Sequence, residues 1–231
     1  SILSENGASS NTGAVQSHFQ SAYCDDDLSK QDVFYYVYGI LHSQEYRDRY
    51  ADNLVKELPR IPRVKLAVHF WNFCAAGRKL ADLHLNYETV EPYPVADNTG
   101  GMTLSNADYR VTRMKYGKKG KEKDLTTLHY NDKITLTGIP LEAYEYVVNG
   151  KPALDWVVER QCVKTDKDSG IVNDANDWAI ETMNNPRYPL ELFQRVITVS
   201  LETMKIVKSL PPLEIMEGEA VDLQANTSPV H

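Results

Sequence analysis

In this 231-residue chain the apolar residues follow a helical spacing except in residues 109–139, where the pattern is typical of β-strands. A fold for this chain must therefore combine helices with a sheet. The stretches YRVTRMKY, LTTLHY and KITLTGI are rich in β-branched and aromatic residues, and the turn-prone stretches GKKGKEKD and ND separate them. This pattern predicts a three-stranded antiparallel meander. The segments on either side carry helical spacing instead. The sequence therefore predicts an α/β fold of the α+β type, with helices bracketing a small antiparallel sheet.

Apolar residues at steps of three and four predict the flanking helices. Ser29 and Asp32 resemble a capping box, which marks the start of a first short helix. The tyrosines of its YYVYGIL stretch are expected to pack in the core rather than stack on bases. A second short helix follows a break at residues 42–43 and ends before Pro59. Further helices are predicted over residues 65–86, 141–148, 153–160 and 190–208.

Composition divides the chain into three parts. Residues 1–28 are polar and then mildly helical, and we expect them to form an N-terminal connecting segment. Residues 29–213 hold the periodic patterns and are expected to form the main domain, whereas the acidic residues 214–231 are expected to form a tail. No apolar run approaches the ~20 residues that cross a bilayer. Three cysteines far apart fit a reducing compartment, so the sequence predicts a soluble, cytoplasmic protein without a membrane partner.

Short motifs that would carry catalysis or bind a metal are incomplete in this chain. The stretch NPRY (185–188) approaches the base-clasping turn of adenine methyltransferases, but its third residue is Arg, and a proline-capped helix start is favoured. The stretch GKKGK (117–121) lacks the spacing of a phosphate-binding P-loop. The stretch after Asp166 lacks calcium-loop spacing and is expected to be an ordered loop held by Asx-type bonds. The sequence therefore predicts no catalytic residue and no metal site.

A basic stretch lies inside the predicted sheet of an acidic chain. Residues 110–123 hold seven basic residues and one acid, a net charge of +6, whereas the whole chain carries −7. A two-stranded ribbon fits the major groove of DNA, where lysines neutralise phosphates and arginines also pair with guanine. The alternative is a solvated hairpin tip without a partner.

The predicted DNA-contacting residues form two sets. In the first set, the lysines at the ribbon tip are expected to neutralise phosphates. Its two arginines are expected on the preceding strand, where a guanidinium could hydrogen-bond a base edge. Its members are Arg110, Arg113, Lys115, Lys118, Lys119, Lys121 and Lys123. The second set, in the helical block, is the fallback surface and consists of Arg60, Arg63, Arg78 and Lys79.

Four long blocks of this chain resemble the C-terminal target-recognition (specificity) domain of single-chain Type I (Type ISP) restriction–modification enzymes. They begin DVFYYVYGILHS, FWNFCAAGRKL, TGIPLEAYEYV and VITVSLETMKI. They occur in the family's order and occupy residues 32–62, 70–88, 137–179 and 196–213. The resemblance therefore covers most of residues 32–213.

In that family one polypeptide carries a restriction endonuclease, an ATP-dependent DNA translocase (helicase), a DNA adenine methyltransferase and the recognition domain. The resemblance implies that residues 29–213 form a non-catalytic domain that reads double-stranded DNA and presents the target adenine to a methyltransferase domain outside this chain. It implies no cofactor here, while the parent enzyme is expected to use S-adenosylmethionine, ATP and magnesium. The implied partners are double-stranded DNA and the adjacent methyltransferase and translocase domains.

Two other functions compete with this reading. The chain is alternatively a structural coupler that packs against the methyltransferase and translocase domains without reading bases. It is also conceivable as an independent enzyme with an unrecognised site, which the incomplete motifs disfavour.

Overall fold

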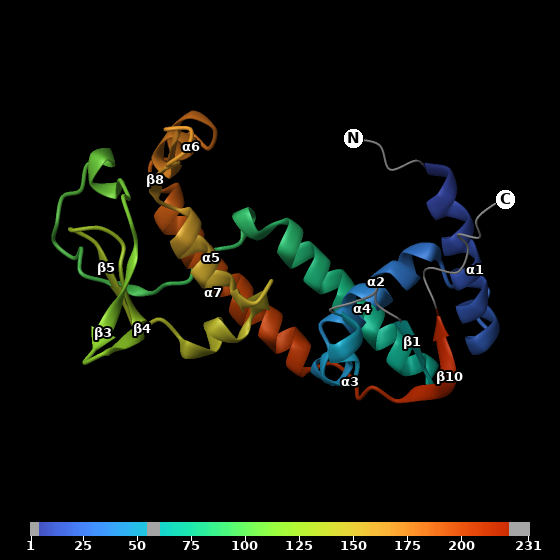
Figure 1. Cartoon of the computed structure of the whole chain (residues 1–231). Coiled ribbons are helices and arrows are strands. Elements are labelled where there is room, and N and C mark those ends of the chain that lie inside the picture. The colour runs from blue at the N-terminus through green and yellow to red at the C-terminus, as the bar shows by residue number, and fades with distance from the viewer. Residues whose placement is uncertain (1–4, 55–60, 222–231) are drawn as a thin grey trace. The chain divides into compact units, whose positions relative to one another are not determined.

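The computed structural model describes residues 5–54 and 61–221, which fall into two compact units (Figure 1). Unit 1 contains residues 1–85 and 205–231, and unit 2 contains residues 86–204. Each unit has its own hydrophobic core. The mixture of helices and small antiparallel sheets confirms the predicted α/β fold. No helix in the described ranges combines the length and the apolar character that a membrane span requires.

Unit 1 is built mainly from helices. They are α1 (Glu5–Tyr23), α2 (Lys30–Leu41), α3 (Gln44–Leu54) and α4 (Ala67–Leu85). Strand β1 (Ile61–Val64) pairs antiparallel with β10 (Ile215–Val221). Ser29 and Asp32 form the predicted capping box: the backbone N–H of Asp32 donates to Ser29 Oγ over 3.1 Å, and that of Ser29 donates to Asp32 Oδ2 over 2.9 Å.

The ends of the chain contribute more to unit 1 than their composition suggested. Residues 5–23 form helix α1, whose Phe19 is fully buried, with its ring centroid 5.2 Å from those of Tyr36 and Phe70. Residues 215–221, within the segment expected to be a tail, form strand β10. The segment expected to connect therefore also contributes to the core of unit 1, because Val15, Phe19 and Tyr23 anchor a mostly polar helix. The burial of Tyr36 agrees with the predicted packing position of that tyrosine.

Two glycines let α2 and α4 cross at backbone contact. A methyl group added at Gly77 would lie 1.8 Å from the carbonyl oxygen of Tyr35, and one at Gly39 would lie 2.4 Å from that of Phe73. Separations this short leave no room for any side chain at either position. The sequence YGILHS therefore carries a glycine whose smallness, rather than its flexibility, determines how the helices pack.

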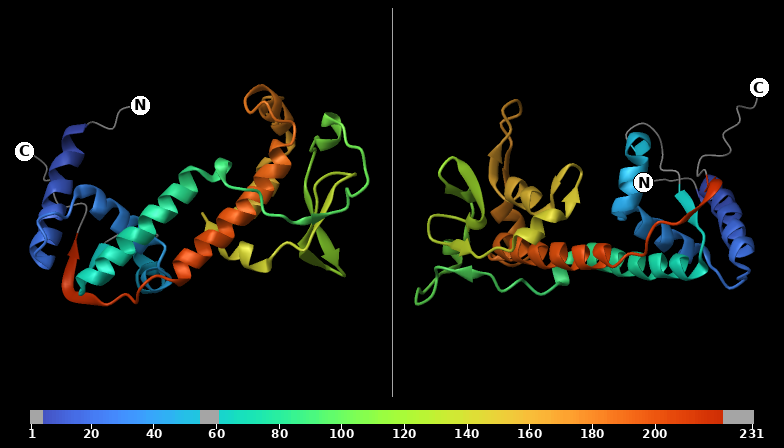
Figure 2. Two further views of the ribbon diagram at one scale, coloured as in Figure 1. Left: turned by 180° about the vertical axis from the view of Figure 1, so that it is seen from behind. Right: turned by 90° about the horizontal axis from the view of Figure 1, so that it is seen from below.

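Unit 2 contains the predicted meander. Strands β3 (Lys115–Lys119), β4 (Glu122–His129) and β5 (Thr135–Thr137) follow one another, and the short β2 (Ala96–Asp97) adds a fourth strand next to β5. Strands β3 and β4 form a two-stranded ribbon whose tip points away from helix α7 (Tyr188–Lys208) (Figure 2). The remaining elements are short, and they surround the sheet and this helix. They are η1 (Tyr87–Thr89), η2 (Asn106–Tyr109), η3 (Leu141–Glu145), β6 (Val147–Val148), β7 (Lys151–Pro152), α5 (Ala153–Arg160), β8 (Val163–Thr165), β9 (Val172–Asp174) and α6 (Ala175–Glu181).

One predicted boundary and one predicted helix in unit 2 were wrong. The first strand of the meander begins at Lys115 rather than near residue 109, so most of GKKGKEKD is strand and only Gly120 and Lys121 turn. The predicted helix over 141–148 is a 3-10 turn followed by a β6–β7 hairpin. Asn149-Gly150 is a strong two-residue hairpin turn, and both residues take the positive φ that it demands, 48° and 86°.

The predicted ordered loop after Asp166 is the turn of a β8–β9 hairpin. The Asp166 carboxylate accepts backbone hydrogen bonds from Asp168 over 3.1 Å and from Ser169 over 2.8 Å, which confirms the Asx-type bonding. The end of that stretch forms helix α6, which Asp174 caps by accepting from the backbone N–H of Asn176.

The Gly77 contact predicts a strong packing effect. Gly77→Ala should lower the free energy of unfolding by ~3 kcal/mol, since the added methyl forces α2 and α4 apart. Gly13→Ala is the matched control, because Gly13 lies in α1 with no atom within 4 Å of its added methyl. The control should stabilise by about 0.5–1 kcal/mol through helix propensity. Equal effects of the two substitutions in urea unfolding would contradict this packing.

A second prediction concerns acid stability. Burial, followed by the nearby His42, lowers the pKa of His84 to about 4, and its ring hydrogen-bonds the Tyr38 hydroxyl. Below pH ~6.5 the unfolded chain takes up the proton first, so stability should fall as pH drops from there to about 4. His84→Gln should remove roughly 1–2 kcal/mol of that loss, measured by urea unfolding at several pH values. An unfolding profile of His84→Gln that has the same pH dependence as that of the original chain would contradict this role of His84.

Candidate nucleic-acid interface

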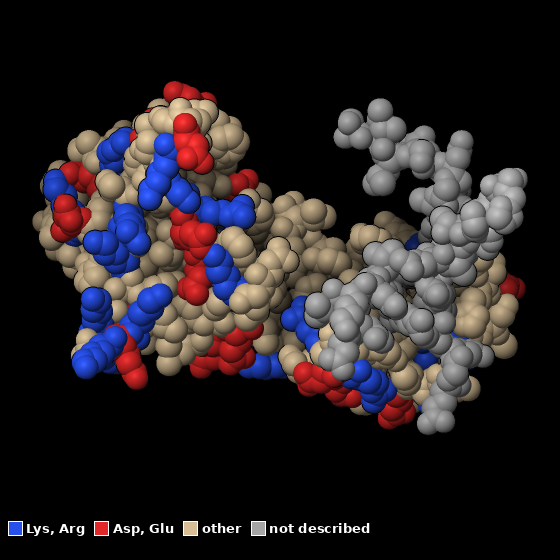
Figure 3. All heavy atoms as spheres, in the orientation of Figure 1, with Lys and Arg blue, Asp and Glu red and all other residues tan. Residues whose placement is uncertain are grey.

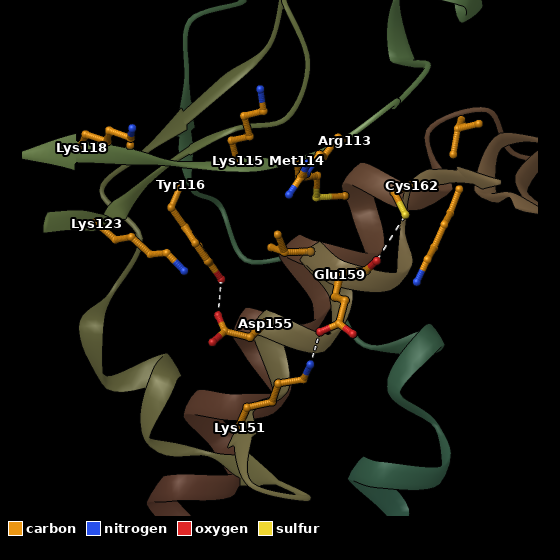
Figure 4. Close-up of a pocket in the computed structure, with 14 residues that line it drawn as sticks. Arg113, Met114, Lys115, Tyr116, Lys118, Lys123, Lys151, Asp155, Glu159 and Cys162 are labelled. Atoms are coloured by element: carbon orange, nitrogen blue, oxygen red, sulfur yellow. Dashed lines mark hydrogen bonds and ion pairs between the residues drawn. The ribbon is translucent and has the colours of Figure 1, made fainter. Parts of the chain in front are cut away.

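An open groove of about 800 Å³ lies in unit 2 between the β3–β4 ribbon and the elements β7, α5 and β8 (Figure 4). Six basic and two acidic side chains line it. They are Arg113, Lys115, Lys118, Lys123, Lys151 and Lys164, with Asp155 and Glu159. The excess of cations over carboxylates around this groove favours an anionic partner.

The ribbon supplies the cations on one side of the groove. Lys118 and Lys123 are opposite each other in the antiparallel register, so like charges face across the two strands. Such a pair is unfavourable without a nearby anion. Within the described part of the chain, no carboxylate lies within salt-bridge distance of Arg113, Lys115, Lys118, Lys123 or Lys164, whereas Lys151 pairs with Glu159.

A hydrogen bond attaches the ribbon to α5. The Tyr116 hydroxyl donates to Asp155 Oδ1 over 2.7 Å, and the Tyr116 and Tyr144 rings meet edge-to-face at 5.9 Å. Burial, with Tyr144 and Asp155 adding to it, raises the pKa of Tyr116, so the phenol remains a donor. Figure 4 shows Tyr116 and Lys123 reaching from the ribbon toward α5. This bond sets the separation between the two walls of the groove.

The predicted ribbon residues divide into two groups. Arg113, Lys115, Lys118 and Lys123 line the groove. The others, Arg110, Lys119 and Lys121, do not line it. Arg110 pairs with Asp174 at 2.6 Å and Lys119 lies 3.9 Å from Asp124, while Lys121 lies exposed in the turn.

One expectation about the arginines was wrong: Arg110 and Arg113 precede strand β3 rather than lie on it. Figure 3 shows Lys and Arg side chains gathered around the end of the ribbon, at the lower left. The ribbon tip is therefore basic. The two arginines that precede the ribbon differ from each other: Arg110 pairs with Asp174, whereas Arg113 has no salt-bridge partner among the described residues.

The described members of the second predicted set differ in exposure and in contacts. Arg60 lies outside the described residues. Arg63 is only 8% exposed, beside the Tyr23 ring. Arg78 pairs with Asp32 at 2.5 Å and lies over the Tyr35 ring.

Lys79 is exposed on α4. Arg63 and Arg78 thus make contacts inside unit 1, although the side chain of Arg78 remains 43% exposed, and Lys79 is exposed as well.

Four charged lining residues were not among the residues predicted from the sequence: Lys151, Asp155, Glu159 and Lys164. Asp155 and Glu159 are four residues apart on α5, and the opposite face of that helix buries Leu154 and Val157. Amphipathic spacing over 153–160 was a usable signal that these acids share an exposed face. No local sequence pattern predicts that β7 and β8 lie beside the ribbon, because that arrangement depends on tertiary packing.

The NPRY stretch makes structural contacts. The Asn185 side chain accepts from the backbone N–H of Arg187 over 3.0 Å and donates to Glu191 over 2.9 Å. Tyr188 begins α7, and its hydroxyl donates to Glu88 over 2.5 Å. These contacts agree with the predicted helix start. In the described ranges, no three His, Cys, Asp or Glu side chains are grouped so as to hold a metal ion.

Comparison with known proteins gives one family. The family described as "Type ISP C-terminal specificity domain" matches residues 7–192. No curated protein matches the chain.

Three solved structures are similar over most of the chain. One is a nuclease-deletion mutant of the Type ISP restriction-modification enzyme LlaGI in complex with a DNA substrate mimic, with 46% identity, a TM-score of 0.69, and coverage of 83% of this chain and 14% of that one. Another is the ATP-dependent Type ISP restriction-modification enzyme LlaBIII bound to DNA, with 42% identity, a TM-score of 0.71, and coverage of 83% and 12%. A third is a DrdV–DNA complex, with 33% identity, a TM-score of 0.68, and coverage of 88% and 20%.

The chain therefore spans a fifth or less of the length of these similar proteins. The family match covers most of this chain, and the solved structures share its fold at 33–46% identity. The resemblance inferred from the four sequence blocks is confirmed. This chain belongs to the Type ISP C-terminal specificity domain family.

Proposed function

We propose that this chain is the sequence-reading domain of a restriction–modification enzyme and that it docks on double-stranded DNA through the groove and the β3–β4 ribbon. The observation that carries the proposal is the lining of the groove: six cations, of which five have no salt-bridge partner among the described residues. Unpaired cations that converge on one surface are the electrostatic footprint of a nucleic-acid site. The DNA-bound state of the three similar structures supports the same partner.

In this proposal the chain itself performs no catalysis. It presents a target adenine to a methyltransferase domain of a longer polypeptide, which also carries the translocase and the nuclease. S-adenosylmethionine, ATP and magnesium would serve those domains. The proposed location is the cytoplasm, where such an enzyme meets DNA and where the three free cysteines stay reduced.

Within this scheme we propose boundaries for the recognition domain. Residues 29–213 hold the groove and the ribbon, residues 1–28 connect to the preceding domain, and residues 214–231 follow the domain. In this proposal helix α1 has two roles: it connects to the preceding domain, and its Phe19 packs in the core of unit 1.

A coupler function remains a second candidate because unit 1 exposes large apolar side chains. Phe34 is 60% exposed, Val68 59% and Leu85 80%. Exposed apolar groups of this size favour contact with another protein surface. The coupler requires no DNA contact from the ribbon, so substitutions there separate the two candidates.

The first binding prediction concerns phosphate contacts. Lys118→Ala should weaken binding by a similar factor on every duplex, and the slope of log affinity against log salt should fall by roughly one. The reason is that one fewer counterion is released when Lys118 no longer neutralises a phosphate. Lys79→Ala is the control, because Lys79 is an exposed lysine of unit 1 that does not line the groove. If Lys79→Ala changes the slope and Lys118→Ala does not, DNA binds to unit 1 instead.

The second binding prediction concerns base reading. Arg113→Lys keeps the charge but loses the planar fork, so it should cost ~1–3 kcal/mol on the preferred sequence and little on random DNA. Fluorescence anisotropy with both duplexes measures the difference. Arg110→Lys is the matched control, since its guanidinium is already paired with Asp174. Equal losses on both duplexes after Arg113→Lys would show that Arg113 contacts phosphate only.

A further inference from the structure

Helix α5 places two carboxylates in the middle of a basic groove. Asp155 and Glu159 lie one turn apart on the face that lines the groove, while Leu154 and Val157 are buried on the other face. The ribbon supplies cations on one side of them, and Lys151 of β7 lies on the other (Figure 4). A surface that only gripped phosphates would be weakened by central carboxylates, because like charges repel. The two acids therefore need separate explanations.

The two acids differ in what already binds them. Asp155 accepts the hydrogen bond from Tyr116 and so holds the ribbon in place. The side chain of Glu159 is 60% exposed, and its ion-pair partner is Lys151. The Lys151 ammonium also lies 3.7 Å from the centre of the Trp156 ring, which keeps it beside Glu159. Asp155 thus has a structural contact, whereas Glu159 extends into the open groove.

The ion pair gives Glu159 a particular chemistry. Lys151 offsets the negative charge of Glu159, which reduces its repulsion of phosphates at a distance. The hydrogen bond from Lys151 also lowers the pKa of Glu159, so the carboxylate stays ionised at neutral pH. An ionised carboxylate accepts hydrogen bonds and donates none. Its exposed lone pairs are therefore open only to a donor.

We propose that Glu159 is a specificity-determining residue, which accepts a hydrogen bond from the exocyclic amino group of a cytosine or an adenine docked in the groove. Cytosine N4 and adenine N6 are the base-edge donors of the major groove, whereas guanine and thymine present acceptors at those positions. Base edges lie between two phosphate backbones, which matches acids on α5 with cations on both sides. This inference rests on the proposed function and adds a named residue and a class of base to it.

Selection from a randomised duplex library by the 231-residue chain tests the proposal, followed by affinity measurements on the enriched duplex and its single-base variants. An amide both donates and accepts, so Glu159→Gln should accept guanine or thymine where the original chain selects cytosine or adenine. The discrimination at that one position should fall by about 5- to 150-fold. Binding to random DNA should stay equal or become tighter, since one negative charge is removed.

Two matched variants make the test specific. Asp155→Asn removes the same charge one turn earlier but keeps an oxygen that accepts from Tyr116, so binding to random DNA should stay equal or become tighter, with base preferences unchanged. Glu181→Gln removes an exposed charge on α6, outside the lining of the groove, and should change neither affinity nor preference. Thermal unfolding of each variant checks that the fold is intact.

The outcomes distinguish this inference from the function on which it rests. If the original chain enriches a sequence and Glu159→Gln keeps every preference, Glu159 does not read a base and the inference is wrong. If Asp155→Asn relaxes a preference instead, the reading residue is Asp155 and the inference is equally wrong. If the original chain enriches no sequence, the proposed function fails, and the inference fails with it.

Discussion

The hydrogen bond from Tyr116 to Asp155 is the contact on which the groove depends, because it joins a ribbon strand to α5 over 2.7 Å. The β3–β4 ribbon is two strands wide at its tip, and its register is interrupted between Tyr116 and Gly117. An irregularity of this kind bends a strand and strengthens its twist. Gly117 permits the close approach, since an added methyl there would meet Thr127 at 2.9 Å. The bend lies where the Tyr116 hydroxyl reaches Asp155 of α5. The ribbon residues that follow Tyr116, including Lys118 and Lys123, then line the groove.

Some basic side chains of this acidic chain pair with carboxylates, whereas others remain unpaired and gather around the groove. The net charge is −7, so duplex DNA is repelled by much of the surface. Screening limits that repulsion to about 8–10 Å at ordinary salt, which lets a compact cluster of cations act locally. Arg78 and Arg110 are each held by one carboxylate, at 2.5 and 2.6 Å, and so add little to this field. The unpaired lysines of the ribbon and Arg113 supply most of it.

The sequence predicted which helices and strands exist better than where they end and which distant segments they contact. The capping box at Ser29 and the long helical periods have local causes, so α2, α4 and α7 lie where the pattern placed them. The β6–β7 hairpin was missed although Asn149-Gly150 is a local signal, because the apolar spacing before it also suits a helix. Helix α1 begins earlier than the mildly helical pattern indicated, and strand β10 was not predicted, because both depend on contacts with residues distant in sequence: Phe19 packs on Tyr36 and Phe70, and β10 pairs with β1.

The same distinction applies to the candidate interface. The basic stretch was visible because its charges are consecutive, and four of its seven basic residues line the groove. What sequence alone did not show is which cations are neutralised. Arg110 and Arg113 are three residues apart and alike in chemistry, yet Asp174, more than sixty positions away in the chain, pairs with only one of them. A cation that folding leaves without a carboxylate keeps its full attraction for an external anion, whereas a paired one must first break its own contact. Pairing, rather than charge count, therefore separates the arginine suited to reading a base from the arginine that holds the fold together.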